Sequence, residues 1–212
     1  MDDHGNVDTA GVTRPNAFLG RISSEVRSLA AQVCRRSDGE RILDVGCGNG
    51  LLFAEIGNNG CTLFGLDSDL EQMRVGRQIL HDNQVESAMF ALGDASHLPY
   101  KDNVFDKVLL LNTLMNIQSD EFVKAFIAEL IRITLPGGKI LVDIRNNANW
   151  ILRTRYWLHN RKSDFNVRGF ALRHLRGLFE AHNCEISTLH SIGPWLPFGP
   201  SGILIEAERR VD

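Results

Sequence analysis

Residues 42–50 read ILDVGCGNG, and this stretch decides the fold. An apolar run leads into Asp44, glycines follow at every second position from Gly46 to Gly50, and Leu51 begins another apolar run. The pattern predicts a buried strand, a tight glycine turn and the start of a helix. Glycine allows a sharp turn and the close approach of a ligand, while a helix start offers free N–H groups and a positive dipole end.

Two classes of ligand-binding fold use a turn of this kind. Dinucleotide folds use G-x-G-x-x-G, in which the third glycine lets the helix pack closely. In this chain Leu51 stands at that third position, which disfavours a nicotinamide oxidoreductase. The pattern Asp44-x-Gly46-x-Gly48-x-Gly50 instead resembles the first motif of class I S-adenosylmethionine-dependent methyltransferases. A glycine turn that binds no ligand is the simplest alternative.

Composition places the chain among soluble globular proteins. Its 212 residues suit one domain, 43% are hydrophobic and 23% are charged. A net charge of −3 argues against a general nucleic-acid binder. No apolar run is long enough to span a membrane, and residues 1–10 are too acidic and polar for a signal or transit peptide. Residues 1–15 are expected to be flexible.

The four cysteines are expected to be reduced thiols. They stand at positions 34, 47, 61 and 184, without the spacing of a metal site, so no metal is predicted. Cys47 lies inside the glycine turn, which is a poor place for a disulfide. Reduced cysteines and the absence of a targeting segment favour a cytoplasmic location.

The end of the second predicted strand carries a further candidate. Residues 61–66 predict a short strand that ends at Asp67, followed by Ser68 and a helix over 70–80. A carboxylate at this position can accept hydrogen bonds from both ribose hydroxyls of an adenosine. The alternative is that Asp67 caps the helix, although Ser68 or Asp69 could do so instead.

Two more strings resemble the same methyltransferase family. Residues 93–110 read GDASHLPYKDNVFDKVLL. The resemblance implies that Asp94 accepts a hydrogen bond from the adenine amino group. It also implies that the N–H of Ala95 contacts the adenine ring and that Leu98 packs beside this ring. Residues 135–139 read LPGGK, which matches the turn before the fifth strand of the family. The resemblance covers about residues 40–145. The cofactor-binding residues that it implies are Asp44, Gly46, Cys47, Gly48, Asp67, Ser68, Asp94, Ala95 and Asn112.

The alternation of strands and helices over 41–144 predicts an α/β fold with a mostly parallel sheet and helices on both faces. The resemblance implies seven strands in a three-layer, doubly wound arrangement, with 185–189 and 203–208 forming a C-terminal antiparallel hairpin. We expect a single domain over 1–212. Ligands of such sheets bind beyond the carboxyl ends of the strands. Asp44, Asp67, Asp94 and Asn112 should therefore meet in one crevice.

Methyl transfer needs positioning and exclusion of water more than it needs a particular side chain, so no catalytic residue is assigned. Residues 112–116 lack the Asn-Pro-Pro-aromatic signature of nucleic-acid amino methyltransferases, so DNA is not expected as a substrate. Asn116 stands where many relatives carry a histidine or an aromatic residue.

The stretch 145–176 is the least family-like part of the chain. It carries eight basic residues and one acidic residue, whereas the whole chain has a net charge of −3. We expect residues 145–167 to be an inserted acceptor-binding or lid segment for an anionic molecule. The alternatives are a solvated basic face or a surface for an anionic membrane. The candidate substrate-binding residues are Asn116, Arg145, Tyr156 and His159, and Arg145 is expected to open onto the crevice.

The sequence therefore predicts a methyltransferase that uses S-adenosylmethionine and acts on a small or medium-sized, anionic acceptor. Two alternatives stay open. One is methylation of protein or RNA, and the other is a non-catalytic subunit that binds the cofactor and supports a partner. The oligomeric state and the identity of the acceptor are not fixed by the sequence.

Overall fold

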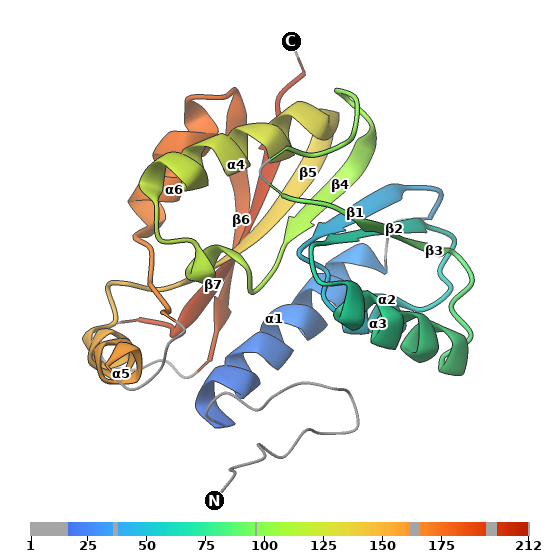
Figure 1. Ribbon diagram of the computed structural model, residues 1–212. Helices are drawn as coiled ribbons and strands as arrows, with labels where there is room; N and C mark the ends of the chain where they lie inside the picture. The colour runs from blue at the N-terminus through green and yellow to red at the C-terminus, as the bar shows by residue number, and fades with distance from the viewer. Residues whose placement is uncertain (1–16, 36–37, 96, 162–165, 194–198, 212) are drawn as a thin grey trace, which may run out of the picture.

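The computed structural model describes residues 17–35, 38–95, 97–161, 166–193 and 199–211 (Figure 1). The expectation for residues 1–15 lies outside the described residues.

Seven strands form one sheet in the order β3-β2-β1-β4-β5-β7-β6. Strands β1 to β5 run parallel, and β7 is antiparallel to both of its neighbours (Figure 1). The predicted α/β fold with a C-terminal hairpin is therefore confirmed. The strands are β1 (Arg41–Val45), β2 (Thr62–Asp67), β3 (Ala88–Leu92), β4 (Phe105–Leu110), β5 (Thr134–Arg145), β6 (Cys184–Ile192) and β7 (Gly202–Arg209).

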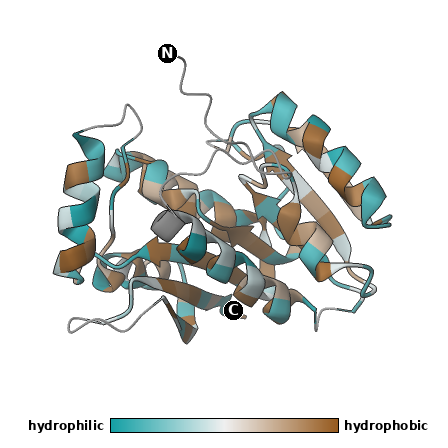
Figure 2. Ribbon diagram, turned by 90° about the horizontal axis from the view of Figure 1, so that it is seen from below, coloured by the Kyte–Doolittle hydropathy of each residue, from teal (hydrophilic) through white to brown (hydrophobic). Residues whose placement is uncertain are grey.

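Helices cover both faces of this sheet (Figures 1 and 2). Side chains of α1, α2 and α3 share one apolar cluster with Ile42, and side chains of α4 and α6 share the other with Leu43. Ile42 and Leu43 are adjacent in β1 and both fully buried, as expected for a strand covered on its two faces. The helices are α1 (Ala17–Cys34), α2 (Leu51–Ile56), α3 (Leu70–Asp82), α4 (Asp120–Ile133), α5 (Trp150–Asn160) and α6 (Leu172–Glu180), with a 3₁₀ turn, η1 (Leu114–Asn116).

Helix starts follow the expected capping chemistry. The Ser119 hydroxyl accepts a hydrogen bond from the N–H of Phe122 and caps α4. The Asp69 carboxylate accepts from the N–H groups of Glu71 and Gln72 and caps α3. Asp67 therefore does not cap α3, which leaves it available at the end of β2.

Three local features differ from the sequence-based expectation. β5 begins at Thr134, so the LPGG stretch is an irregularity within the β4–β5 pairing instead of a turn before the strand. The sequence did not predict α5, although Asn149 caps it through the N–H of Leu152. Finally, the sequence predicts a helix over about 168–182, but α6 begins only at Leu172, because residues near Phe170 extend alongside the end of β5.

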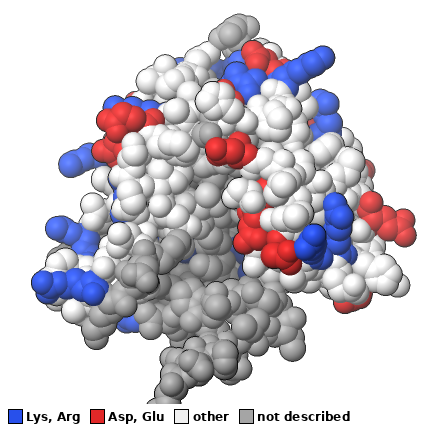
Figure 3. All heavy atoms as spheres, viewed as in Figure 1, with Lys and Arg blue, Asp and Glu red and all other residues white. Residues whose placement is uncertain are grey.

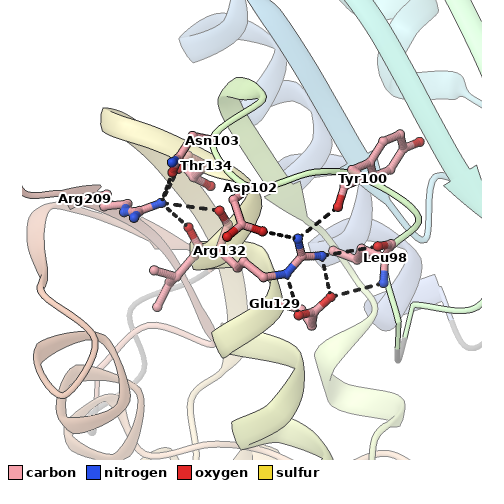
Figure 4. A network of polar contacts seen from close by, with 9 residues as sticks. Leu98, Tyr100, Asp102, Asn103, Glu129, Arg132, Thr134 and Arg209 are labelled. Carbon is pink, nitrogen blue, oxygen red and sulfur yellow. Dashed lines mark hydrogen bonds and ion pairs between the residues drawn. The ribbon is translucent and has the colours of Figure 1, made fainter.

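The edge of the sheet at the amino ends of β4 and β5 is held by two arginines (Figure 4). Arg209, at the end of β7, donates to the carbonyl of Thr134 at 2.6 Å and to the side chain of Asn103 at 2.6 Å. Arg132 of α4 donates to the carbonyls of Leu98 and Tyr100 in the loop between β3 and β4. This network therefore lies at the amino ends of the strands. Parallel sheets bind their ligands at the opposite, carboxyl ends. No helix in the described parts of the chain is long and apolar enough to cross a bilayer.

Candidate functional site

A pocket of about 160 Å³ lies at the carboxyl ends of β1 and β4, where the glycine turn joins β1 to α2. This is the edge of a parallel sheet at which ligands bind. The pocket is lined by Arg27, Asp44, Gly46, Cys47, Gly48, Asn49, Leu51, Leu52, Leu111 and Asn112. It therefore brings together five predicted residues of the cofactor site: Asp44, Gly46, Cys47, Gly48 and Asn112.

Each glycine of the turn adopts a left-handed backbone conformation, but the three have different surroundings. Gly46 has φ = 76°, and a Cβ there would lie 2.5 Å from the hydroxyl oxygen of Thr113. Gly50 has φ = 67°, and a Cβ there would lie 2.6 Å from the ring of Phe90. Gly48 has φ = 52°, yet apart from its chain neighbours no atom of the described residues lies within 4 Å of its Cβ position. Gly46 and Gly50 thus allow close packing of the protein, whereas Gly48 leaves open space beside the turn.

Asp67 fixes the glycine turn from the end of β2. Its Oδ2 accepts a hydrogen bond from the N–H of Gly48 at 2.7 Å, and its Oδ1 accepts from the N–H of Asp69 at 2.9 Å. A carboxylate has about four acceptor positions, so each oxygen can still accept from a ligand hydroxyl. Ser68, the next predicted residue, is exposed.

Asp44 is the most perturbed acid of this crevice. Its side chain is 4% exposed, and its Oδ1 has no hydrogen-bond partner in the described part of the chain. Burial, followed by the negative charge of Asp67, raises the pKa of Asp44 to about 8. A buried acceptor without a donor is costly, so this oxygen is suited to meet a donor of a ligand.

The ends of β2 and β3 lie next to each other. Asp67 pairs with Leu92 in the sheet, and the N–H of Gly93 donates to the carbonyl of Asp67 at 3.0 Å. This pairing places Asp94, which is exposed, and Ala95, which is half-buried, beside the end of β2. The buried Leu98 is fixed through its own backbone, because its N–H donates to Glu129 at 3.2 Å.

Asn112 follows β4 with a positive φ of 55°, and its backbone N–H donates to the Asp143 carboxylate. The Asn112 side-chain oxygen accepts from the Arg145 guanidinium at 2.9 Å, and its amide nitrogen donates to the carbonyl of Ser23 at 3.4 Å. Asn112 thus joins the cofactor pocket to α1 and β5.

The expectation that Arg145 opens onto the crevice is wrong. Arg145 is fully buried and forms an ion pair with Asp143 at 2.5 Å; it also donates to the Ser23 hydroxyl at 3.1 Å. Sequence reasoning missed Asp143, Ser23 and the pocket residue Arg27. A signal for Asp143 was present, because residues two apart in a strand share a face.

The other predicted substrate residues lie around η1 and α5. Tyr156 packs with Leu152, Val167 and Met115, so α5 contacts the 3₁₀ turn that follows β4. Burial raises the pKa of Tyr156 to about 12. Asn116 is exposed and donates to the carbonyl of Asn112 at 3.4 Å, and His159 is half-buried. The structure thus brings Asn116 and Tyr156 to the region beyond β4, whereas Arg145 at the end of β5 is buried.

Residues 43–142 match the family model described as "Methyltransferase domain". This part of the chain is a methyltransferase domain. The family predicted from the sequence is therefore confirmed for residues 43–142.

Curated relatives that match about half of this chain are also named methyltransferases. Demethylmenaquinone methyltransferase of Renibacterium salmoninarum is 34% identical over 116 residues, which is 55% of this chain and 46% of that protein. A ubiquinone/menaquinone biosynthesis C-methyltransferase of Cupriavidus pinatubonensis is 36% identical over 107 residues, which is 49% of this chain and 42% of that protein. The chain thus spans less than half the length of these two relatives.

A solved structure of magnesium protoporphyrin IX methyltransferase from Synechocystis, with bound S-adenosylhomocysteine, shares the fold of the methyltransferase domain. It superposes with a TM-score of 0.72 at 17% sequence identity, over 94% of this chain and 90% of that chain. At this identity the likeness shows the fold alone.

Proposed function

We propose that this chain is a methyltransferase that uses S-adenosylmethionine to methylate a small or medium-sized acceptor, within a single domain. The observation that carries the proposal is the crevice at the glycine turn. It combines open space at Gly48, a buried acceptor oxygen on Asp44 and the carboxylate of Asp67, whose oxygens can accept further hydrogen bonds. These three groups suit a ligand that carries both an amino group and ribose hydroxyls.

The cofactor brings a methyl group already activated by the positive sulfur to which it is bonded, so the protein mainly binds, orients and excludes water. In the proposed site, Asp67 accepts hydrogen bonds from the ribose hydroxyls and Asp44 faces a donor. Asp94 and the N–H of Ala95 contact the adenine, beside the buried Leu98. No residue of the chain is assigned as a general base.

The names of the relatives support a small-molecule acceptor. One is named a demethylmenaquinone methyltransferase and another a ubiquinone/menaquinone biosynthesis C-methyltransferase, although the similarity covers 46% and 42% of these proteins. We favour this class over protein or RNA, because no described feature of the structure favours a macromolecular substrate. The cytoplasmic location and the exclusion of DNA remain predictions.

Calorimetric titration tests the cofactor class. We expect S-adenosylhomocysteine to bind and NAD to bind little or not at all, because Leu51 stands in place of the third glycine of dinucleotide folds. Binding of NAD without binding of S-adenosylhomocysteine would contradict the proposal.

The Asp67→Ala variant tests the ribose contact. Loss of hydrogen bonds to a charged acceptor amounts to about 1.5–3 kcal/mol, so the affinity for S-adenosylhomocysteine should fall roughly ten- to a hundredfold. The matched control is Asp69→Ala, which removes a neighbouring carboxylate that caps α3 without touching the glycine turn. If both variants bind S-adenosylhomocysteine equally well, Asp67 has no role in the cofactor site.

A further inference from the structure

A second and larger pocket, of about 580 Å³, lies along α5 and is separate from the glycine turn. Helix α5 stands apart from the sheet, beyond the carboxyl end of β5 (Figure 1). The volume falls within the range of about 300–1,000 Å³ for small-molecule sites. The pocket is lined by Asn147, Trp150, Arg153, Thr154, Tyr156, Trp157, Asn160 and Gly169.

The walls of this α5 pocket are aromatic. Trp150 is 51% exposed and Trp157 is 56% exposed, although rings of this size usually lie largely buried. The Arg161 guanidinium sits 4.3 Å from the centre of the Trp157 ring and holds that side of the pocket. Two exposed indole rings on one helix offer flat surfaces for an aromatic ligand.

The charge of the α5 pocket is positive. Arg153 lines it, and none of its described lining residues is acidic. Lys and Arg side chains also cluster over α5 at the lower left of Figure 3. Guanidinium groups bind carboxylates through paired, charge-assisted hydrogen bonds, so this lining favours an anion.

A buried hydroxyl gives an independent indication of a ligand. Tyr156 is 5% exposed and lines the α5 pocket, and its hydroxyl has no partner of hydrogen-bond geometry in the described part of the chain. A buried hydroxyl without a partner is destabilising, so a ligand oxygen at this point would satisfy it.

The α5 pocket is linked to the cofactor pocket by a short series of buried groups. The positive charge of Arg145 acts on Tyr156, and the same guanidinium donates to Asn112, which lines the cofactor pocket. Met115, three residues after Asn112, packs in one cluster with Tyr156. Arg145 and Met115 therefore connect Tyr156, which lines the α5 pocket, with the segment that carries Asn112 of the cofactor pocket.

We propose that the α5 pocket is an acceptor subsite that binds a flat aromatic molecule with a carboxylate or similar anionic group. The rings of Trp150 and Trp157 contact the aromatic face, Arg153 binds the anion and the Tyr156 hydroxyl donates to a ligand oxygen. The role as an acceptor subsite rests on the methyltransferase function proposed above, whereas binding of the aromatic anion does not.

The experiment uses 2-naphthoate as the probe and the cofactor-free full chain. We expect quenching of tryptophan fluorescence and a calorimetric binding isotherm, with much weaker binding of the neutral naphthalene-2-carboxamide. Arg153→Ala should weaken 2-naphthoate binding about ten- to a hundredfold, through loss of a charge-assisted contact. The matched control Arg155→Ala removes an exposed arginine of the same helix that does not line the pocket, and it should bind like the parent chain.

Tyr156→Phe provides the second test, because it removes only the hydroxyl. The variant should weaken 2-naphthoate binding several-fold, whereas its thermal stability should fall by no more than the interaction of the hydroxyl with the nearby Arg145 guanidinium contributes. A drop in stability together with unchanged binding would show that the hydroxyl serves the fold and would overturn this part of the proposal.

Two outcomes would overturn the α5 pocket as a whole. One is the absence of 2-naphthoate binding to a chain that still binds S-adenosylhomocysteine, which would leave the proposed function intact. The other is that Arg153→Ala binds 2-naphthoate normally but no longer binds vesicles of mixed phosphatidylcholine and phosphatidylserine, which would make α5 a membrane-docking surface. Binding of 2-naphthoate without binding of S-adenosylhomocysteine would support the pocket and contradict the proposed function.

Discussion

At the scale of single residues, Asp44 shows how the end of a buried strand makes a carboxyl group sensitive to pH. The pKa of Asp44 is about 8 in the folded chain, whereas an unfolded aspartate titrates near 4. Between these values the folded chain keeps a proton that the unfolded chain has released. The contribution of Asp44 to stability is therefore fully present below about pH 4 and is lost as the pH rises towards 8.

The Asp44→Asn variant should remove this pH dependence. Relative to the variant, the parent should lose stability by up to about 1.4 kcal/mol for each pH unit between pH 4 and pH 8. Chemical denaturation at pH 5, 6.5 and 8 measures the difference. Stability curves of parent and variant that stay parallel across this range would show that Asp44 has an ordinary pKa.

Single residues also mark the limit of sequence reasoning about the site. Glycine spacing and the acids at the strand ends predicted Asp44, Gly48 and Asp67, because those features follow from the order of the elements. The direction of Arg145 did not follow, since it depends on Asp143 and Ser23 packing around its guanidinium. A basic residue at the end of a strand can face a ligand or an internal acid, and only the packing decides between them.

At the scale of elements, α4 has a role beyond covering the sheet. Arg132 and Glu129, one turn apart on α4, form an ion pair at 2.7 Å (Figure 4). Arg132 also donates to the carbonyls of Leu98 and Tyr100, and Glu129 accepts from the N–H of Leu98. The helix therefore fixes the loop that begins at the proposed adenine contacts.

Arg132→Ala should lower the free energy of unfolding by about 1–3 kcal/mol, because several partly buried acceptors lose their donor. The affinity for S-adenosylhomocysteine should fall with it, since the loop that carries Asp94 and Leu98 is loosened. The matched control is Arg74→Ala, which breaks another arginine–glutamate pair one turn apart, on the exposed surface of α3. That change should cost less than about 1 kcal/mol. If both variants lose the same free energy of unfolding, Arg132 does not stabilise this loop more than an ordinary surface ion pair would.

Elements also differ in how far the sequence predicted them. The predicted strand over 61–66 and the predicted helix over 70–80 agree with β2 and α3 to within two residues. Helix α5 was missed, since only Leu152 and Tyr156 of its side chains are buried and its other positions are largely charged or aromatic. A helix that buries so narrow a face leaves little periodic signal.

At the scale of the whole molecule, Arg145 joins parts of the chain that are far apart in sequence. It links β5 to Ser23 of α1 and to Asn112 at the end of β4. Arg145→Met should lower the free energy of unfolding by about 3–5 kcal/mol, because Asp143 is left buried without its partner. Thermal or chemical denaturation measures the loss. The same substitution at Arg176, an exposed residue of α6, should have little effect, and equal effects at both positions would refute the structural role of Arg145.

The four cysteines have a practical consequence for spectroscopy. All four are buried thiols, and burial raises the pKa of Cys34 to about 12 and that of Cys184 to about 11; it also raises the pKa of Cys47 and Cys61. Thiol reagents attack the thiolate, so the native cysteines should react slowly with maleimides at neutral pH. A single cysteine introduced at Leu158, which is exposed on α5 and does not line the α5 pocket, should then accept a fluorophore or a spin label selectively. Movement of α5 on ligand binding could be followed by such a label in the otherwise unaltered chain.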